Sequence, residues 1–322
     1  MPIQRSVSAL IGTLLWCASA TAQDYPNRAI RILTGTSAGG MVDSFGRSLA
    51  SHLSQSLGTP VVLENRAGGS HMISHEAVAK AEPDGYTLLQ NSQIGLVFVQ
   101  GTHKSVPYDP IKDFTHITTL FSSPFYLLVH PAVPVRSVEE LIAYARANPG
   151  KLNYGSIGVG SMHHLGMELL SIRTGIRMVH VPYKGSAQLM PDILSGQIQL
   201  IFQGPTSSIP PARAGKLHAL AITGPERSRA MPQLPTMAQA GVPDFNIDSW
   251  FGLSGPANLP RPIVERLNRE TVSFLRNKET IEKAAVENID LLPGTPEQHV
   301  ARVRSEIPLW TKVMRAAGVQ PE

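Results

Sequence analysis

Short apolar runs and longer amphipathic stretches alternate along most of the chain, and this alternation restricts the fold more than any other feature of the sequence. Strand-like runs occupy residues 30–33, 61–63 and 86–89. Between the first two, apolar side chains recur every three or four residues over 42–57, which predicts a helix that ends at Gly58. A strand–helix–strand–helix–strand order predicts a parallel sheet with right-handed crossover connections.

A second alternating set begins after Phe121, with a strongly apolar strand at 125–129. A helix then opens at Ser137, where Glu140 completes a capping box. The chain returns to a strand near Trp250 and ends in two helices. We therefore expect an α/β protein of two lobes, each a mostly parallel sheet flanked by helices, with ligands bound between the lobes at the carboxyl ends of the strands. The expected boundaries are residues 23–123 and 247–322 for the first lobe and residues 124–246 for the second lobe.

The first 22 residues have the pattern of a secretory signal peptide. Arg5 is their only charged residue, an apolar run follows it, and Ala20-Thr21-Ala22 fits a small-x-small cleavage site. The run is too short to cross a bilayer comfortably, and a buried N-terminal helix is the alternative interpretation. We expect cleavage near Ala22, a mature chain that begins near Gln23, and a periplasmic location.

The composition argues against several functional classes. The only cysteine, Cys17, lies in the expected signal peptide, so the mature chain would lack disulfides, thiolate metal ligands and cysteine nucleophiles. The chain has 28 lysines and arginines against 24 acidic residues, with no basic run, which argues against nucleic acid as a partner. The same mild excess of positive charge is compatible with a small anionic ligand.

The stretch LTGTSAGGMVD joins the first strand to the first helix. Its small residues are Ser37, Ala38, Gly39 and Gly40. Backbone N–H groups left accessible at the positive end of a helix can bind an anion. Alternatively, the glycines only permit a tight turn, and Asp43 in the first helical turn only complements the helix dipole. The stretch contains neither G-x-G-x-x-G nor a P-loop lysine, which argues against a nucleotide phosphate.

The stretch YGSIGVGSMHHLGMELL repeats this arrangement in the second lobe. Ser156, Gly160 and Ser161 precede or begin a second helix, so two helix ends could point into one cleft. This pairing favours an anion site over a merely tight turn. His163 and His164 are adjacent on the expected helix, so they point about 100° apart and make a poor metal chelate.

A third strand-end loop, VPYKGSAQ, contains Tyr183 and Lys184. Lys184 could pair with a carboxylate, although a solvated side chain is the simpler interpretation, and Tyr183 either contacts a ligand or packs beneath the loop. His71 and His75 would share one face of a helix, as zinc ligands do, but no third ligand is evident in the sequence. We therefore expect no metal and no cofactor.

The sequence has no G-x-S-x-G elbow and no cysteine nucleophile in the expected mature chain. A catalytic site would have to use a Ser/His/Asp arrangement that only the fold brings together. Catalysis therefore remains an alternative to ligand binding.

Several stretches, taken together and in order, resemble the Bug family of periplasmic solute receptors of tripartite tricarboxylate transporters. They are YPNRAIRIL, PVVLENRAGG, EPDGYTLL, VPYDPIKDF, ANPGKLNYGSIGVGSMHHL, VHVPYKGSAQ, LPTMAQAGVPDF and SWFGLSGPANLPRPIVERLN. The resemblance implies a two-lobed periplasmic binding protein (Venus flytrap) fold that closes on a small carboxylate. Ligands in the family include di- and tricarboxylates, acidic amino acids and aromatic acids, held by backbone amides, hydroxyls and water.

The resemblance also implies roles for individual residues at the cleft. Asp43 matches the acidic position of the family's first loop, and Asn91 matches an asparagine that commonly follows the third strand. Gly160, Ser161 and His164 match the family pattern G-x-G-[ST]-x-x-H, in which His164 could be structural.

Three stretches depart from the family pattern. The first loop reads GTSAGG at residues 35–40, where the family commonly has P-x-P-P-G-G, and serines and histidines alter the glycine-rich second loop at residues 70–75. A strand of the second lobe ends in Phe202-Gln203, where the family usually has Phe-Asp. A neutral Gln203 in the cleft disfavours an acidic amino acid and favours a ligand without an ammonium group.

The sequence therefore predicts a periplasmic binding protein, without catalytic activity, that captures a small organic carboxylate. Ligand contacts made by both lobes would favour a closed state. The expected partners are the membrane subunits of a tripartite tricarboxylate-type transporter, and the expected state is a monomer. A periplasmic hydrolase and a sensory ligand-binding protein are the two alternative functions.

Overall fold

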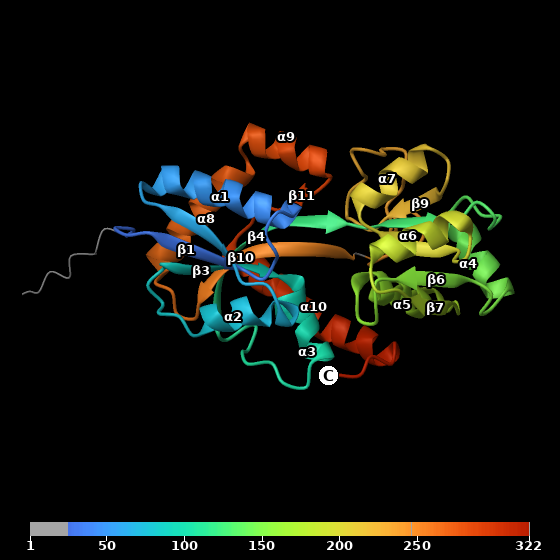
Figure 1. Cartoon of the computed structure of the whole chain (residues 1–322), viewed down its shortest axis with the longest axis horizontal. Coiled ribbons are helices and arrows are strands. Elements are labelled where there is room, and N and C mark those ends of the chain that lie inside the picture. Colours follow the sequence, from blue (N-terminus) through green and yellow to red (C-terminus); the bar gives the residue numbers. More distant parts are fainter. Residues whose placement is uncertain (1–24, 246, 322) are drawn as a thin grey trace, which may run out of the picture.

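Two sheet-and-helix lobes lie side by side in the computed structural model, which describes residues 25–245 and 247–321 (Figure 1). The predicted signal peptide and its cleavage site lie outside these described residues. Among the helices of the described ranges, none combines the length and the apolar character needed to cross a membrane.

The first lobe is built on a six-stranded sheet with the strand order β11-β4-β10-β3-β1-β2. Helices pack on both faces of this sheet. The strands are β1 (Ile30–Thr34), β2 (Val61–Asn65), β3 (Thr87–Ser92), β4 (Phe114–Pro124), β10 (Asp248–Pro256) and β11 (Asp290–Leu291). The helical segments are α1 (Met41–Leu57), η1 (Gly69–His71), α2 (Met72–Ala79), η2 (Ile94–Phe98), α3 (Val99–Thr102), α8 (Arg261–Leu275), α9 (Lys278–Glu287) and α10 (Pro296–Ala316).

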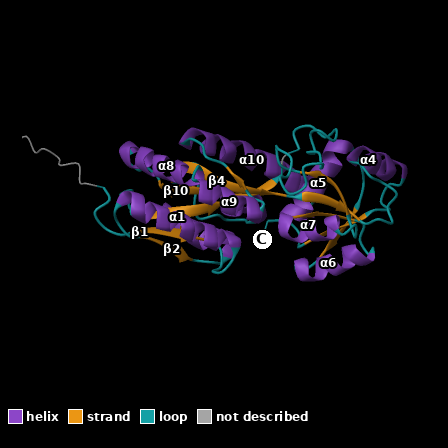
Figure 2. Cartoon of the chain, turned by 90° about the horizontal axis from the view of Figure 1, so that it is seen from above, coloured by secondary structure: helices purple, strands orange, loops and turns teal. Residues whose placement is uncertain are grey.

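The second lobe is built on a five-stranded sheet with the strand order β7-β6-β8-β5-β9. Seen from above, α4 and α5 lie on one side of its strands, and α6 and α7 lie on the other side (Figure 2). The strands are β5 (Tyr126–Val129), β6 (Asn153–Ser156), β7 (Val179–Pro182), β8 (Leu200–Gln203) and β9 (His218–Ile222), and the helices are α4 (Val138–Ala147), α5 (Met162–Thr174), α6 (Ser186–Ser195) and α7 (Pro205–Arg213).

Both faces of each sheet are apolar because successive side chains along a strand point to alternate faces. In β5, Leu127 and Val129 belong to the buried cluster beneath α4 and α5, whereas Tyr126 and Leu128 belong to the cluster beneath α6 and α7. Successive side chains of a strand point to opposite faces, so a continuous apolar run places a core on each side.

Both sheets are mixed, whereas the sequence predicted mostly parallel sheets. β1 pairs in parallel with β2 and β3, and β6 pairs in parallel with β7 and β8. Every antiparallel pair involves β4, β5 or β10. β4 and β5 carry the chain from the first lobe to the second, and β10 follows the return. β5 and β10 are therefore antiparallel to their neighbours β8 and β3, whose connections stay within one lobe.

The strand directions bring the carboxyl ends of both sheets face to face. β4 runs toward the second lobe, and β10 is antiparallel to both β4 and β3, so β3 and its parallel partners β1 and β2 also point toward the second lobe. β5 runs away from the first lobe and is antiparallel to β8, so β8, β6 and β7 point back toward the first lobe. The loops that follow β1, β2, β6, β7 and β8 therefore face the opposite lobe.

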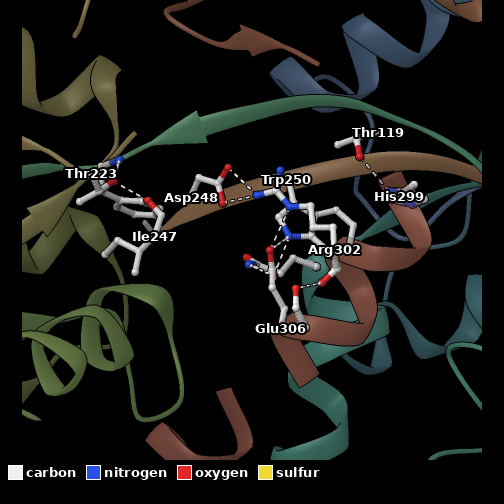
Figure 3. A network of polar contacts seen from close by, with 11 residues as sticks. Thr119, Thr223, Ile247, Asp248, Trp250, His299, Arg302 and Glu306 are labelled. Carbon is white, nitrogen blue, oxygen red and sulfur yellow. Dashed lines mark hydrogen bonds and ion pairs between the residues drawn. The ribbon is translucent and has the colours of Figure 1, made fainter. Parts of the chain in front are cut away.

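The chain returns from the second lobe to the first between β9 and β10, and different partners hold this segment on its two sides (Figure 3). On the second-lobe side, the Thr223 hydroxyl accepts a hydrogen bond from the Phe125 N–H at 2.8 Å and donates one to the Ile247 carbonyl oxygen. On the first-lobe side, Arg302 of α10 donates to both carboxylate oxygens of Asp248 at 2.5 and 2.6 Å. Movement between the lobes therefore bends the chain at both crossings: at or beside the peptide that joins Ile247 to Asp248, and between β4 and β5.

Candidate ligand-binding site

The loop between β1 and α1 presents exposed backbone toward the second lobe. Residues 37–40 are all exposed, and Gly40 is the N-cap of α1 with φ −88° and no side-chain cap. Within the described part of the chain, the N–H groups of Ser37 and Ala38 donate to no other group. The uncapped first turn adds the positive end of the helix dipole. This loop can therefore donate hydrogen bonds to an anion.

The buried side chain of Asp43 is hydrogen-bonded to the loop between β1 and α1. Its carboxylate is 4% exposed and accepts hydrogen bonds from the Gly39 N–H and from Arg47 Nε, both at 3.0 Å. Asn65 Nδ2 bridges the Asp43 carboxylate at 2.9 Å and the Thr36 carbonyl oxygen at 3.0 Å. The bonds from Arg47, Gly39 and Asn65 lower the pKa of Asp43 to about 2. The negative charge of Asp43 is therefore compensated by Arg47 within the first lobe.

The loop between β6 and α5 uses its polar side chains on itself. Ser161 caps α5 by accepting from the His164 N–H, and its hydroxyl donates to the Gly158 carbonyl oxygen at 2.7 Å. The Gly160 N–H donates to His164 Nδ1 at 3.1 Å. The buried Ser156 hydroxyl lies 2.6 Å from His180 Nε2 and accepts from the Gly158 N–H. The polar side chains of this loop are therefore hydrogen-bonded within the second lobe.

His164 is a neutral ring beneath this loop. It stacks on His180 with ring centroids 4.0 Å apart, and burial lowers the pKa of each ring to about 4. Because Nδ1 of His164 accepts the Gly160 N–H, the proton of the neutral ring is on Nε2. His164 therefore positions the loop and is uncharged near neutral pH.

Tyr183 and Gln203 are both held within the second lobe. The Tyr183 hydroxyl donates to Asp192 Oδ2 at 2.7 Å, and burial together with Asp192 raises its pKa to about 12. Gln203 ends β8 and is 5% exposed; its Oε1 accepts from the Gly204 N–H at 3.0 Å and lies 3.2 Å from His163 Nε2. Both side chains lie beside the facing strand ends, Gln203 buried and Tyr183 partly exposed.

The Asn91 side chain points into the core of the first lobe. It is fully buried, its Nδ2 donates to Ser254 Oγ at 2.6 Å, and it lies 3.1 Å from His299 Nε2 of α10. Its neighbour Ser92 ends β3, lies 2.6 Å from His71 Nδ1 and accepts the Gly95 N–H. Ser92, which the sequence did not single out, therefore orders the strand end, while Asn91 belongs to the core beneath α10.

His71 and His75 do not form part of a metal centre in the described structure. His75 is fully buried, its Nδ1 lies 2.9 Å from the His71 carbonyl oxygen, and its ring stacks on Tyr108 at 5.8 Å. Within residues 25–245 and 247–321, no group of three or more histidine, cysteine or acidic side chains is arranged to hold a metal ion.

Buried histidines in the first lobe predict that acid destabilises the protein. Burial lowers the pKa of His75 to about 3 and of His116 to about 4, and it holds the pKa of His299 well below 6.5. The unfolded chain takes up protons below about pH 6.5 while the folded chain does not, so the free energy of unfolding should fall by about 1.4 kcal/mol per pH unit for each such histidine from there toward pH 4.

Urea denaturation at several pH values between about 6.5 and 4 measures this change in the free energy of unfolding. His116→Asn removes one of the three groups, so the variant should lose less stability per pH unit than the parent. An unfolding free energy that does not change over this pH range would contradict the assignment.

Two large grooves are each lined by a single lobe, and the first of them reaches the β1–α1 loop at Gly39 and Asp43. One, of about 970 Å³, runs between α1 and α9, and the other, of about 950 Å³, lies between α4 and β9 in the second lobe. Neither is formed by the loops of both lobes, so each is a competing location for a small ligand.

Comparison with known proteins gives matches over nearly the whole chain. A family model described as "Tripartite tricarboxylate transporter family receptor" matches residues 45–319. Protein BugT of Bordetella pertussis is 33% identical over 315 residues, which cover 98% of this chain and 97% of that protein. A solved R. palustris structure with adipate is 34% identical, with a TM-score of 0.73, and covers 93% of this chain and 100% of that chain. MatC from Rhodopseudomonas palustris with bound malate is 27% identical, with a TM-score of 0.68, and covers 90% of this chain and 100% of that chain.

Proposed function

The chain belongs to the tripartite tricarboxylate transporter receptor family, and we propose that it captures one small organic carboxylate between its lobes for membrane subunits of that type of transporter. The observation that carries the proposal is the exposed β1–α1 loop, which offers backbone N–H groups at an uncapped helix end facing the second lobe. Relatives determined with adipate and malate support a carboxylate as the ligand.

We further propose that the protein acts in the periplasm as a monomer without catalysis, after cleavage near Ala22. The histidines beside the facing strand ends support a binding role. His164 and His180 are neutral, stacked on each other and hydrogen-bonded within the lobe. His180 has the Ser156 hydroxyl beside it, but within the described residues no carboxylate forms a hydrogen bond to either ring to orient it as a general base, as hydrolysis would need.

The ligand is proposed to lack an ammonium group. A bound amino acid would need an acceptor for its positive charge. Gln203 is neutral, and two carboxylates beside the loops, Asp43 and Asp192, already accept hydrogen bonds from Arg47 and Tyr183. Removing an ammonium group from water without such an acceptor is costly.

A thermal-shift screen of the mature protein tests the function. A ligand that binds only the folded state stabilises it by about 2.7 kcal/mol at a hundredfold excess over its dissociation constant. We expect simple dicarboxylates to raise the melting temperature, and glutamate and aspartate to leave it unchanged. Recovery of one unchanged ligand per chain separates binding from hydrolysis, and a chemically altered ligand would support the enzyme alternative.

A further inference from the structure

The second lobe holds the excess of basic residues but none of the ion pairs of the described structure. Residues 124–245 contain ten lysines and arginines and six acidic residues. Every ion pair between side chains of the described residues joins two residues of the first lobe. Positive charges that no carboxylate neutralises are therefore concentrated on the second lobe, and such a surface attracts anionic partners.

Two of these arginines line the groove of about 950 Å³ between α4 and β9. Both are exposed, and each is held by a neutral oxygen atom. Arg136 donates to the Val135 carbonyl oxygen at 2.9 Å, and Arg146 donates to the Thr174 carbonyl oxygen at 2.7 Å. Among the described residues that line the groove, Glu139 is the only acid. The two guanidinium groups are thus positioned beside the groove with their charge uncompensated.

The groove follows an open edge of the second sheet. β9 is the last strand of this sheet and pairs only with β5. At the end of β9, the outer edge is covered, because the Ile222 N–H donates to the Pro235 carbonyl oxygen at 3.0 Å and the Ile222 carbonyl oxygen accepts from the Met237 N–H at 2.9 Å. Residues 218–220 line the groove, and their backbone groups form no hydrogen bond to any described segment other than β5. An open strand edge of this kind can pair with an added strand.

The two walls of the groove differ in character. α4 and α7 lie on opposite sides of the sheet (Figure 2). The arginines belong to the α4 side, whereas Leu217 and Leu234 of the groove belong to the apolar cluster beneath α6 and α7. Side chains of an added strand would alternate between these walls. A strand with acidic residues on one face and apolar residues on the other therefore matches both walls.

We propose that the groove between α4 and β9 is a docking site for an extended acidic segment of another protein. The segment pairs with the outer edge of β9 at residues 218–220 and places its carboxylates beside Arg136 and Arg146. Charge favours this occupant over a second copy of the chain, which would bring the same two arginines together. The groove belongs to the second lobe alone, so docking is independent of the ligand bound between the lobes.

Fluorescence anisotropy of the full mature chain with a labelled peptide tests the proposal. The probe is a peptide in which glutamate and valine alternate, and a lysine–valine peptide is its control. At low ionic strength we expect the acidic peptide to bind at least about tenfold more tightly than the basic one, and salt should weaken its binding. Absence of binding, or equal binding of the two peptides, would overturn the proposal.

A matched pair of double variants locates the peptide. Arg136→Gln with Arg146→Gln keeps polar side chains but removes both charges, and should weaken binding of the acidic peptide about threefold to tenfold. Arg304→Gln with Arg315→Gln removes two exposed charges from α10 of the first lobe and should leave the affinity unchanged. Equal effects of the two double variants would contradict docking in this groove. Circular dichroism checks that both proteins are folded.

Backbone methylation of the peptide tests the strand pairing. A strand bonds to one neighbour only through alternate residues. Methylation of the glutamate nitrogens and methylation of the valine nitrogens should therefore differ, with one peptide losing at least about tenfold in affinity and the other binding as the parent does. Equal affinities of the two methylated peptides would exclude pairing with β9.

Three further measurements separate other occupants from the proposed one. A carboxylate that saturates the cleft should leave the affinity for the peptide unchanged. Competition between them would place the peptide in the cleft and overturn this inference, while carboxylate binding would stand. A dimer in sedimentation experiments that the peptide disperses would assign the groove to a second copy. Binding to vesicles of anionic phospholipid that Arg136→Gln with Arg146→Gln abolishes would assign it to a membrane surface. Either of these two results would also overturn the proposal.

Discussion

Replacing Arg302 with methionine is expected to lower the free energy of unfolding by about 3 to 5 kcal/mol, because it leaves two buried carboxylates without their cation. Arg302 is 20% exposed, Asp248 is 5% exposed and Glu306 is 15% exposed. Arg302 donates to Asp248 at 2.5 and 2.6 Å and to Glu306 at 2.9 Å (Figure 3). Methionine keeps much of the apolar contact but supplies no charge and no donor.

Arg304→Met is the matched control for this prediction. Arg304 lies two residues further along α10 and is exposed, so its loss should change stability by less than about 0.5 kcal/mol. Thermal unfolding compares the two variants, with a drop of at least about 5 °C expected for Arg302→Met. Similar melting temperatures for the two variants would mean that this ion-pair network does not stabilise the crossing between the lobes.

The second large effect is expected for Gly40→Leu, which should weaken carboxylate binding by about 100-fold or more. A leucine at the N-cap of α1 would extend over the loop and block the approach of a carboxylate to its N–H groups, and the loss corresponds to about two charge-assisted hydrogen bonds. A Cβ atom on Gly40 meets nothing within 4 Å, and its φ of −88° suits any residue. The fold should therefore tolerate the change with a loss of at most about 1 kcal/mol.

Ser44→Leu is the control for the Gly40 variant. Ser44 is exposed one turn further along α1 and borders the groove between α1 and α9. We expect it to bind the carboxylate as the parent does. Titration of both variants with the same dicarboxylate decides the question, because unchanged affinity in Gly40→Leu would remove the β1–α1 loop from the site.

The two-lobed α/β fold could be predicted because strand and helix patterns are local in the sequence. Residues 42–57 keep one apolar face, and α1 forms over Met41–Leu57. The directions of the strands were harder to predict from the sequence. The antiparallel pairs arise where β4, β5 and β10 carry the chain between lobes, and these pairings join residues far apart in the sequence.

Orientation of side chains at the strand ends limited the prediction of the site. In β3, Gln90 Nε2 donates to the Val42 carbonyl oxygen on the α1 side, whereas Asn91 points toward α10. A one-residue change of register exchanges these faces, and the sequence alone does not fix it. Asp43 was visible as an acid in the first turn of a helix, but its bond to Asn65 depends on the pairing of β1 with β2.

The network at the crossing between the lobes was missed for a similar reason. Arg302 and Glu306 have the i,i+4 spacing of a helical ion pair, which the sequence displays. Asp248, the second carboxylate that Arg302 binds, lies 54 residues before Arg302 in the sequence. Only the packing of α10 beside β10 brings these groups together.

The most direct test of the account is a crystal structure with the carboxylate of the screen that binds most tightly. The account predicts that a ligand carboxylate oxygen lies within hydrogen-bond distance of the N–H groups of Ser37 and Ala38, and that the same molecule contacts the β6–α5 loop of the second lobe. A ligand in the groove between α1 and α9, or in the groove between α4 and β9, would contradict the account. So would a ligand that contacts only one lobe.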